Sequence, residues 1–195
     1  MQINLHRVKN LSYFIIENFF TENELVEVNK EIKDLKRFAQ TAEKTFTAKK
    51  DDTLLKTGSG LFLDEIYNNN REASPILQGN RKIFDDEIVF AAEDFDAVFG
   101  FLKYATQDAT LLNYYASGEE YKGHRDHCRI SAVTFLGEGS FSGGEFIFPD
   151  QNIVIEAKYN TTVVFPSCVM HKARPTLGQG TRVTMAQFIS YGPAN

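Results

Sequence analysis

Two side chains that can bind the same ion stand two positions apart near the middle of this 195-residue chain. They are His124 and Asp126, with Arg125 between them. In an extended segment, residues two apart project to the same side, so the imidazole and the carboxylate can converge while Arg125 points away. Such a pair is two thirds of a 2-His-1-carboxylate set, which holds Fe(II) and leaves coordination positions open. The same spacing is frequent in surface turns, so an iron site requires a third ligand from another part of the chain.

A third ligand and a cation occur later in the chain. His171 follows the apolar run 161–166, about four predicted strands after Asp126. In a double-stranded barrel, that separation can return the chain beside the first strand, where ligands on rigid strands form a preorganised site. Arg182 begins the last predicted strand with Thr184 two residues on, and a guanidinium beside a hydroxyl suits a carboxylate. The pattern predicts a site for a metal chelator with a distal carboxylate, such as 2-oxoglutarate.

Further motifs surround these candidates. They are Tyr115-x-x-Gly118-x-x-Tyr121-x-x-His124-x-Asp126, Ser142-Gly143-Gly144-Glu145-x-x-Phe148, and Pro166 ahead of His171 with Arg182 eleven positions after it. Each motif is weak by itself, but together they are specific. The region from Asn113 to Ser190 thereby resembles the Fe(II)/2-oxoglutarate-dependent dioxygenases, and most closely their prolyl 4-hydroxylase-like branch.

The resemblance implies a role for each residue. His124, Asp126 and His171 would bind Fe(II), and Arg182 would pair with the distal carboxylate of the co-substrate 2-oxoglutarate, so these four form the catalytic set. Hydroxylation is the expected reaction, with O2 consumed and succinate and CO2 released, because halogenating members lack the carboxylate at the position of Asp126. The implied substrate is a prolyl or other amino-acid residue, or a small molecule, and ascorbate is a further cofactor that the resemblance allows. Positions that line the co-substrate pocket in the family match Tyr115, Thr134 and Thr184.

Helical patterns dominate the first part of the chain that must support this site. An apolar run over 11–20 predicts a buried strand, and Thr21 with Glu24 forms a capping box that predicts a helix behind it. Apolar residues then recur at helical spacing up to Phe38. The polar stretch 39–60 predicts a loop, and the sequence leaves open whether that loop acts as a lid.

Short strands dominate the second part. The region 75–104, which precedes this second part, predicts two helices joined near Asp94. In the second part, short apolar or alternating runs follow one another between turn residues. The predicted strands are 109–115, 130–136, 145–148, 153–157, 161–165, 170–174 and 182–190. This pattern predicts an α+β fold, a double-stranded β-helix (jelly roll) with N-terminal helices packed on its major sheet. We expect a single dioxygenase domain over 1–195, with a helical part over about 1–107 and a jelly-roll core over about 108–195.

Composition narrows the partners. The net charge is −5, and six acidic residues with no Lys or Arg lie between Ile83 and Leu102. A face that binds duplex nucleic acid needs the opposite sign, so nucleic acid is not an expected partner. No apolar run is long enough to span a bilayer, so no membrane partner is expected. The first residues lack the layout of a signal peptide and two cysteines are too few for a disulfide framework, which favours a cytoplasmic location.

Other functions stay open at this point. Asn113-x-Tyr115 ahead of His124 resembles the motif of nucleobase oxidative demethylases, although Phe188 stands where those enzymes carry a second arginine. A non-catalytic jelly-roll module that binds another metal is a further alternative, and a structural zinc site is one form of it. Candidate ligands for such a zinc site are His124, His127, Cys128, Cys168 and His171. The sequence does not determine the substrate or the oligomeric state.

Overall fold

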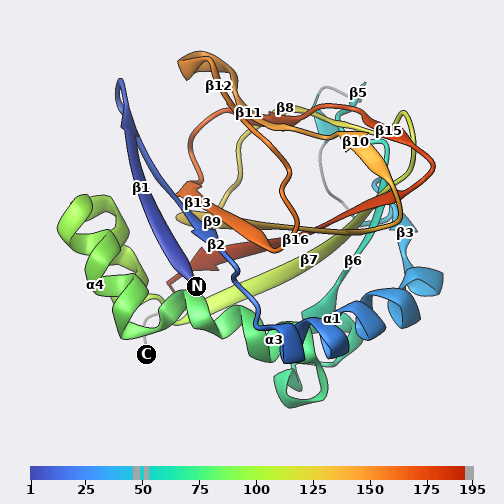
Figure 1. Cartoon of the computed structure of the whole chain (residues 1–195), viewed down its shortest axis with the longest axis horizontal. Helices are drawn as coiled ribbons and strands as arrows, with labels where there is room; N and C mark the ends of the chain where they lie inside the picture. The colour runs from blue at the N-terminus through green and yellow to red at the C-terminus, as the bar shows by residue number, and fades with distance from the viewer. Residues whose placement is uncertain (46–48, 51–52, 192–195) are drawn as a thin grey trace.

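Two β-sheets face each other in the computed structural model of the chain, which describes residues 1–45, 49–50 and 53–191. Within these residues, the larger sheet has eight antiparallel strands in the order β1 (Gln2–Val8), β2 (Leu11–Glu17), β13 (Thr161–Pro166), β9 (Ile130–Glu138), β16 (Thr181–Ser190), β7 (Gln107–Tyr115), β6 (Ser59–Phe62) and β3 (Gln40–Thr41). The smaller sheet has four, in the order β12 (Ile153–Ile155), β11 (Phe146–Phe148), β14 (His171–Ala173) and β8 (Tyr121–His124). Figure 1 shows the smaller sheet on one side of the larger sheet and helices on the other. The predicted jelly roll with N-terminal helices on its major sheet is confirmed.

The helix layer begins with α1 (Glu22–Leu35), at the predicted capping box. The Thr21 hydroxyl accepts a hydrogen bond from the Glu24 N–H at 3.3 Å, and the Glu24 carboxylate accepts one from the Thr21 N–H at 2.7 Å. The helix buries its apolar stripe against the larger sheet. Phe38, the last residue of the predicted stripe, instead lies beyond the helix in η1 (Lys36–Phe38) and is exposed.

One acidic residue of α1 is buried, which the charged face of the predicted helix does not anticipate. The Glu31 carboxylate accepts hydrogen bonds from the Ser74 hydroxyl at 2.5 Å and from the Ile76 N–H at 2.8 Å. Both partners lie at the start of α3 (Pro75–Gly79), where Pro75 occupies the first turn as predicted. The carboxylate therefore links α1 to the free N–H groups of the next helix on the same sheet.

The predicted helical region 75–104 is more divided than expected. It contains four segments, which are α3, η3 (Asn80–Phe84), α4 (Asp86–Phe95) and η4 (Ala97–Tyr104). The breaks fall at Asp85 and Asp96, which have extended backbone, and Asp96 starts η4 by accepting a hydrogen bond from the Val98 N–H at 3.1 Å. The joint predicted near Asp94 is present at Asp96, but the prediction of only two helices is wrong. The other helical segments described are α2 (Leu63–Ile66), η2 (Arg71–Ala73) and η5 (Pro149–Gln151). No helix in the described part of the chain is long and apolar enough to cross a bilayer.

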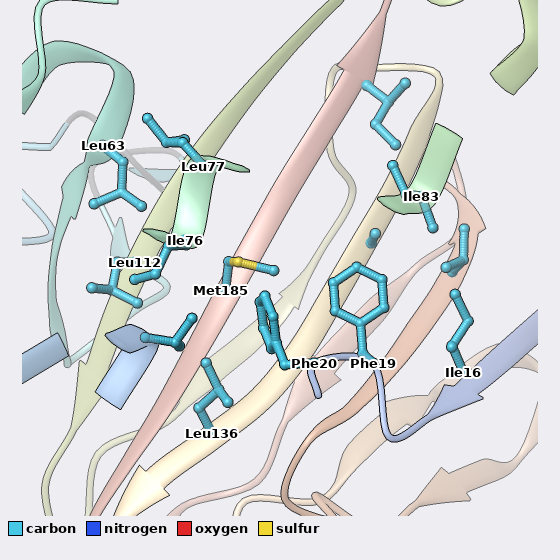
Figure 2. Close-up of a cluster of buried hydrophobic side chains, with 14 of the residues drawn as sticks. Ile16, Phe19, Phe20, Leu63, Ile76, Leu77, Ile83, Leu112, Leu136 and Met185 are labelled. Carbon is cyan, nitrogen blue, oxygen red and sulfur yellow. The ribbon is translucent and has the colours of Figure 1, made fainter. Parts of the chain in front are cut away.

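The central strand β16 serves two layers, because successive side chains of a strand point to opposite faces. Val183 and Met185 lie in the core between the larger sheet and the helices. Figure 2 shows Met185 in the same cluster of apolar side chains as Ile76 of α3. Arg182 and Thr184 point to the opposite face, into a pocket between the two sheets. One strand thereby anchors the helices and positions two of the candidate site residues.

Strands from the first 107 residues complete both edges of the larger sheet. The sequence pattern does not predict β1, because an edge strand that is largely exposed carries few apolar residues. Part of the predicted loop 39–60 is also strand, since β6 pairs with β7, and residues 46–48 and 51–52 of that loop lie outside the described residues. The two parts separated at about residue 107 therefore share one sheet. In the described part of the chain, two short pairs lie outside both sheets: β4 (Lys49–Lys50) with β5 (Thr53–Leu54), and β10 (Phe141–Gly143) with β15 (Thr176–Gly178).

Candidate active site

The two predicted histidine ligands face each other across paired strands. His124 at the end of β8 lies opposite His171 at the start of β14. Asp126 follows β8, and its carboxylate oxygens lie 3.6 Å from His124 Nε2 and 3.5 Å from His171 Nε2. One ligand atom from each residue lies within 4.8 Å of the other two. Among the described residues, this is the one group of three or more His, Cys, Asp or Glu side chains able to hold a metal ion.

Both histidines present the same ring nitrogen to this group. Nδ1 of His124 lies 2.9 Å from the Lys122 carbonyl oxygen, and Nδ1 of His171 lies 2.9 Å from the Val169 carbonyl oxygen. A carbonyl oxygen only accepts, so Nδ1 carries the proton and Nε2 keeps a free lone pair. Burial, and for His124 also the neighbouring His171, lowers the pKa of each imidazole to about 4. Both rings are neutral at pH 7, which is the form that binds a metal.

A serine that the sequence analysis did not single out holds the carboxylate of Asp126. The Ser131 hydroxyl donates to Asp126 Oδ2 at 2.6 Å and lies 2.8 Å from the Ser167 hydroxyl. The Asp126 N–H also donates to the Ser167 carbonyl at 3.0 Å. Burial raises the pKa of the Asp126 carboxyl, although the Ser131 hydrogen bond opposes the shift. A bound cation would offset the cost of this buried charge, so the three side chains suit a divalent metal.

Arg182 is buried elsewhere in the same pocket. It is 1% exposed, its Nε donates to the Thr176 hydroxyl at 3.0 Å, and its guanidinium carbon lies 3.9 Å from the centre of the Tyr115 ring. Gly144 makes room for it, because a Cβ at that position would lie 2.4 Å from Arg182 Cδ. The Nη2 atom is buried and has no hydrogen-bond partner among the residues that the structure describes. Burial lowers the pKa of Arg182. A buried guanidinium with a free donor fits an anionic ligand, and a carboxylate matches its geometry.

The pocket between the sheets contains most of the residues that the resemblance places there. His124, Asp126 and His171 line it and are called the metal end below; Arg182, Thr184 and Tyr115 also line it and are called the anion end. Thr134 does not line the pocket, which corrects the prediction for this residue. It stands between two β9 residues that face the pocket, so it points to the opposite face, where its hydroxyl lies 2.7 Å from that of Thr162.

Apolar side chains form much of the remaining wall. They come from both sheets and include Val133, Phe135, Phe146 and Ala186. Such a wall keeps water from the buried charges and strengthens their interactions with a ligand. Phe188 also lines the pocket, so a phenyl ring stands where a nucleobase demethylase would carry its second arginine. The wall therefore gives no support to the nucleobase alternative.

A buried lysine beside the pocket is the second functional candidate that the sequence analysis missed. Lys56 is fully buried, and its Nζ donates to Asn113 Oδ1. Burial lowers the pKa of Lys56 to about 7. The available signal is the pair Gly58 and Gly60, since glycines at alternate positions leave one face of a strand bare. A Cβ at Gly60 would lie 3.2 Å from Lys56 Nζ, so the bare face accommodates the amine.

The residues of the zinc alternative do not assemble. His127 and Cys168 are exposed. Cys128 is half-buried, with its Sγ 2.8 Å from the Ser167 hydroxyl. None of these three side chains belongs to the metal-binding group of the described residues. The geometry therefore favours the open three-ligand site over a closed tetrahedral one.

The part of the chain that holds this pocket matches a known family. Residues 109–190 match the family model of the 2OG-Fe(II) oxygenase superfamily. This part of the chain belongs to that superfamily. The predicted recognition is confirmed, and an oxygenase of this superfamily uses the predicted Fe(II), 2-oxoglutarate and O2. A comparison with curated proteins returns no match.

Solved structures share the oxygenase fold over nearly the whole chain. A prolyl-4-hydroxylase from Pseudomonas putida is 18% identical, with a TM-score of 0.67 and coverage of 94% of each chain. A prolyl hydroxylase from Trichoplax adhaerens, solved with a hypoxia inducible factor peptide fragment, is 12% identical, with a TM-score of 0.66 and coverage of 91% of this chain and 83% of that one. A viral collagen prolyl hydroxylase from Paramecium Bursaria Chlorella virus-1, solved as a 2OG complex, is 16% identical, with a TM-score of 0.54 and coverage of 92% and 96%. At these identities the likeness establishes the fold.

Proposed function

We propose that this oxygenase hydroxylates a prolyl or other amino-acid residue, or a small molecule, with release of succinate and CO2. The observation that carries the proposal is that one pocket is lined both by three metal ligands and by a buried guanidinium. Three metal-ligand atoms lie within 4.8 Å of one another, and the same pocket contains a buried guanidinium with an unpaired Nη2. A molecule with a chelating group and a separate carboxylate satisfies both, which is the chemistry of 2-oxoglutarate.

Each residue of the pocket has a separate task in this proposal. His124, Asp126 and His171 would hold Fe(II) through Nε2, a carboxylate oxygen and Nε2, respectively. Arg182 would hold the distal carboxylate of 2-oxoglutarate through Nη2, beside the hydroxyl of Thr184. When bound, Fe(II), 2-oxoglutarate and O2 supply the oxidising power that inserts one oxygen atom into a C–H bond of the substrate. The protein orients these groups and excludes water from them.

Support for an amino-acid or peptide substrate comes from two observations. The solved structures with this fold include several prolyl hydroxylases, and that from Trichoplax adhaerens was solved with a peptide. In this chain, two cationic side chains are direct sequence neighbours of the proposed metal ligands: Lys172, which lines the pocket, and Arg125, which is exposed and donates to the Cys168 carbonyl at 2.9 Å. A carboxylate on a peptide or an amino acid suits such surroundings.

The test is a screen for 2-oxoglutarate turnover. The Fe(II)-loaded protein would be supplied with O2, 2-oxoglutarate and, in separate reactions, proline-containing peptides, free amino acids and methylated nucleotides. We expect succinate release to rise with a peptide or an amino acid and the substrate to gain one oxygen atom by mass spectrometry. Asp126→Ala is the matched negative control. Turnover that rose only with methylated nucleotides would contradict the proposal and favour a demethylase.

A further inference from the structure

Lys56 lies where the two sheets meet. The chain on either side of it runs beside β8, because the Lys122 N–H donates to the Leu55 carbonyl at 2.7 Å and the Thr57 N–H donates to the Glu120 carbonyl at 3.1 Å. The chain then enters β6, which pairs with β7 of the larger sheet. This short crossing joins β8 of the smaller sheet to the larger sheet and carries Lys56 into the interior, where it is 0% exposed.

Hydrogen bonds connect Lys56 to the wall of the pocket. Its Nζ donates to Asn113 Oδ1, and Asn113 Nδ2 donates to Thr184 Oγ1 at 3.3 Å. An ammonium group only donates, so it determines which way the Asn113 amide faces. Since Thr184 Oγ1 accepts from Asn113, the hydroxyl proton of Thr184 points away from Asn113. Asn113 and Thr184 both line the pocket, so the orientation set by Lys56 reaches the space where the co-substrate would bind.

Two buried cations, Arg182 and Lys56, lie near the ring of Tyr115. The Arg182 guanidinium carbon lies 3.9 Å from the centre of the Tyr115 ring, and Lys56 Nζ lies 5.9 Å from it. Within the described residues, neither cation forms an ion pair with Asp or Glu. Burying two positive groups without an anion is costly. A dianion removes that cost, and 2-oxoglutarate carries two carboxylates.

We propose that Lys56 is a positioning residue for 2-oxoglutarate, which orients Asn113 and Thr184 and adds its positive charge to that of Arg182 at the anion end. The inference rests on the proposed function, because it names a further residue of the same pocket. It does not follow from the family match, which begins at residue 109 and leaves Lys56 outside. It predicts that the affinity for 2-oxoglutarate depends on a residue from the N-terminal part of the chain.

The titration of Lys56 gives this role a measurable signature. Burial lowers the pKa of Lys56 to about 7; the Glu119 carboxylate opposes the shift and the Arg182 guanidinium adds to it. Among the described residues, the other titratable groups near the amine are His124, with a pKa of about 4, Tyr115, with a pKa of about 12, and Tyr121, whose pKa burial raises above its ordinary value, so none of them changes charge between about pH 6.5 and 9. A bound dianion favours the charged amine. Above pH 7, binding therefore takes up a proton, and affinity falls as the pH rises.

The test measures binding without turnover. The affinity of the anaerobic Fe(II)-loaded protein for 2-oxoglutarate would be measured by calorimetry between pH 6.5 and 9 for the wild type, Lys56→Met and Lys56→Arg. Lys158→Met is the matched control, because Lys158 is exposed and pairs with Glu17 on the surface. We expect Lys56→Met to bind 2-oxoglutarate roughly tenfold more weakly at pH 7 and to lose the pH dependence, while its Fe(II) affinity stays unchanged. Lys56→Arg keeps the charge at every pH, so its affinity should not fall from pH 7 to 9.

The outcomes separate this inference from the function on which it rests. If wild-type protein loaded with Fe(II) did not bind 2-oxoglutarate, the proposed function would fail. If the wild type bound it and Lys56→Met bound it equally well, or kept the wild-type pH dependence, only the role of Lys56 would be refuted. If Lys56→Met did not fold, Lys56→Arg would provide the test. The role of Lys56 would be refuted if the affinity of Lys56→Arg for 2-oxoglutarate fell between pH 7 and 9 as much as that of the wild type.

Discussion

The metal end and the anion end of the pocket are built by different means. At the metal end, each histidine is oriented by the carbonyl two residues before it, Lys122 for His124 and Val169 for His171. At the anion end, contacts join residues far apart in the sequence, with 57 positions between Lys56 and Asn113 and 71 between Asn113 and Thr184. The metal end is therefore encoded by short motifs, and the anion end by the packing of the whole sheet. Variants at the anion end should therefore weaken 2-oxoglutarate binding and spare Fe(II) binding, and variants at the metal end should act first on Fe(II) binding.

The largest effect is expected at the metal ligands. Asp126→Ala or His171→Ala removes one of three ligands, whereas changes to outer partners alone cost about 10- to 100-fold in metal affinity. We expect Fe(II) affinity to fall by more than about 100-fold and turnover to be lost, as measured by anaerobic titration with Fe(II). His127→Ala is the matched control, since His127 is exposed and outside the metal-binding group. Loss of metal binding in His127→Ala would revive the zinc alternative.

Arg182→Met should separate the two ends most clearly. Removing the guanidinium takes away Nη2, the buried donor that has no hydrogen-bond partner among the described residues and is proposed to hold the distal carboxylate. Affinity for 2-oxoglutarate should fall on the order of 100-fold, because truncating one partner of a buried charge pair has effects of this size. Fe(II) affinity should remain at the wild-type value in the same preparation. Unchanged 2-oxoglutarate binding would show that another residue holds the carboxylate.

Gly144→Ala tests whether 2-oxoglutarate binding depends on the position of the Arg182 side chain as well as on its charge. The added Cβ would lie 2.4 Å from Arg182 Cδ and must displace the side chain. We expect 2-oxoglutarate affinity to fall roughly 10- to 100-fold, as a misplaced binding group does, with Fe(II) affinity retained.

Gly118→Ala provides the matched control for this substitution. Gly118 has φ +84° and Gly144 has φ +71°, so both variants strain the backbone by about 1–2 kcal/mol, but a Cβ at Gly118 meets no atom within 4 Å. Equal losses of 2-oxoglutarate affinity in the two variants would mean that backbone strain, and not the contact with Arg182, is responsible.

Ser131→Ala should have the smallest effect. It removes the 2.6 Å hydrogen bond that holds Asp126 but leaves all three metal ligands in place. We expect Fe(II) affinity to fall roughly tenfold, and 2-oxoglutarate affinity of the metal-saturated protein to stay the same. A loss as large as that of Asp126→Ala would indicate that Ser131 maintains the fold of the site, which thermal unfolding of the two variants would show.

The same contrast explains which parts could be predicted from the sequence. The capping box at Thr21 and the convergence of His124 with Asp126 follow from local spacing, which a sequence displays directly. Resemblance alone predicts Thr134 in the pocket, and this prediction fails because a shift of one residue along a strand turns a side chain to the other face. For Lys56 the local signal is only the alternate glycines Gly58 and Gly60, and its burial also depends on the pairing of β6 with β7, which local spacing does not display.

The most direct test of a shared pocket for metal and co-substrate is the visible absorption of the anaerobic protein as 2-oxoglutarate is added after Fe(II). Chelation of the metal by the keto acid should produce a weak charge-transfer band in the wild type. The band should be absent from Asp126→Ala and should require much more 2-oxoglutarate in Arg182→Met. Fully Fe(II)-loaded wild-type protein that bound 2-oxoglutarate without developing this band would contradict the shared pocket.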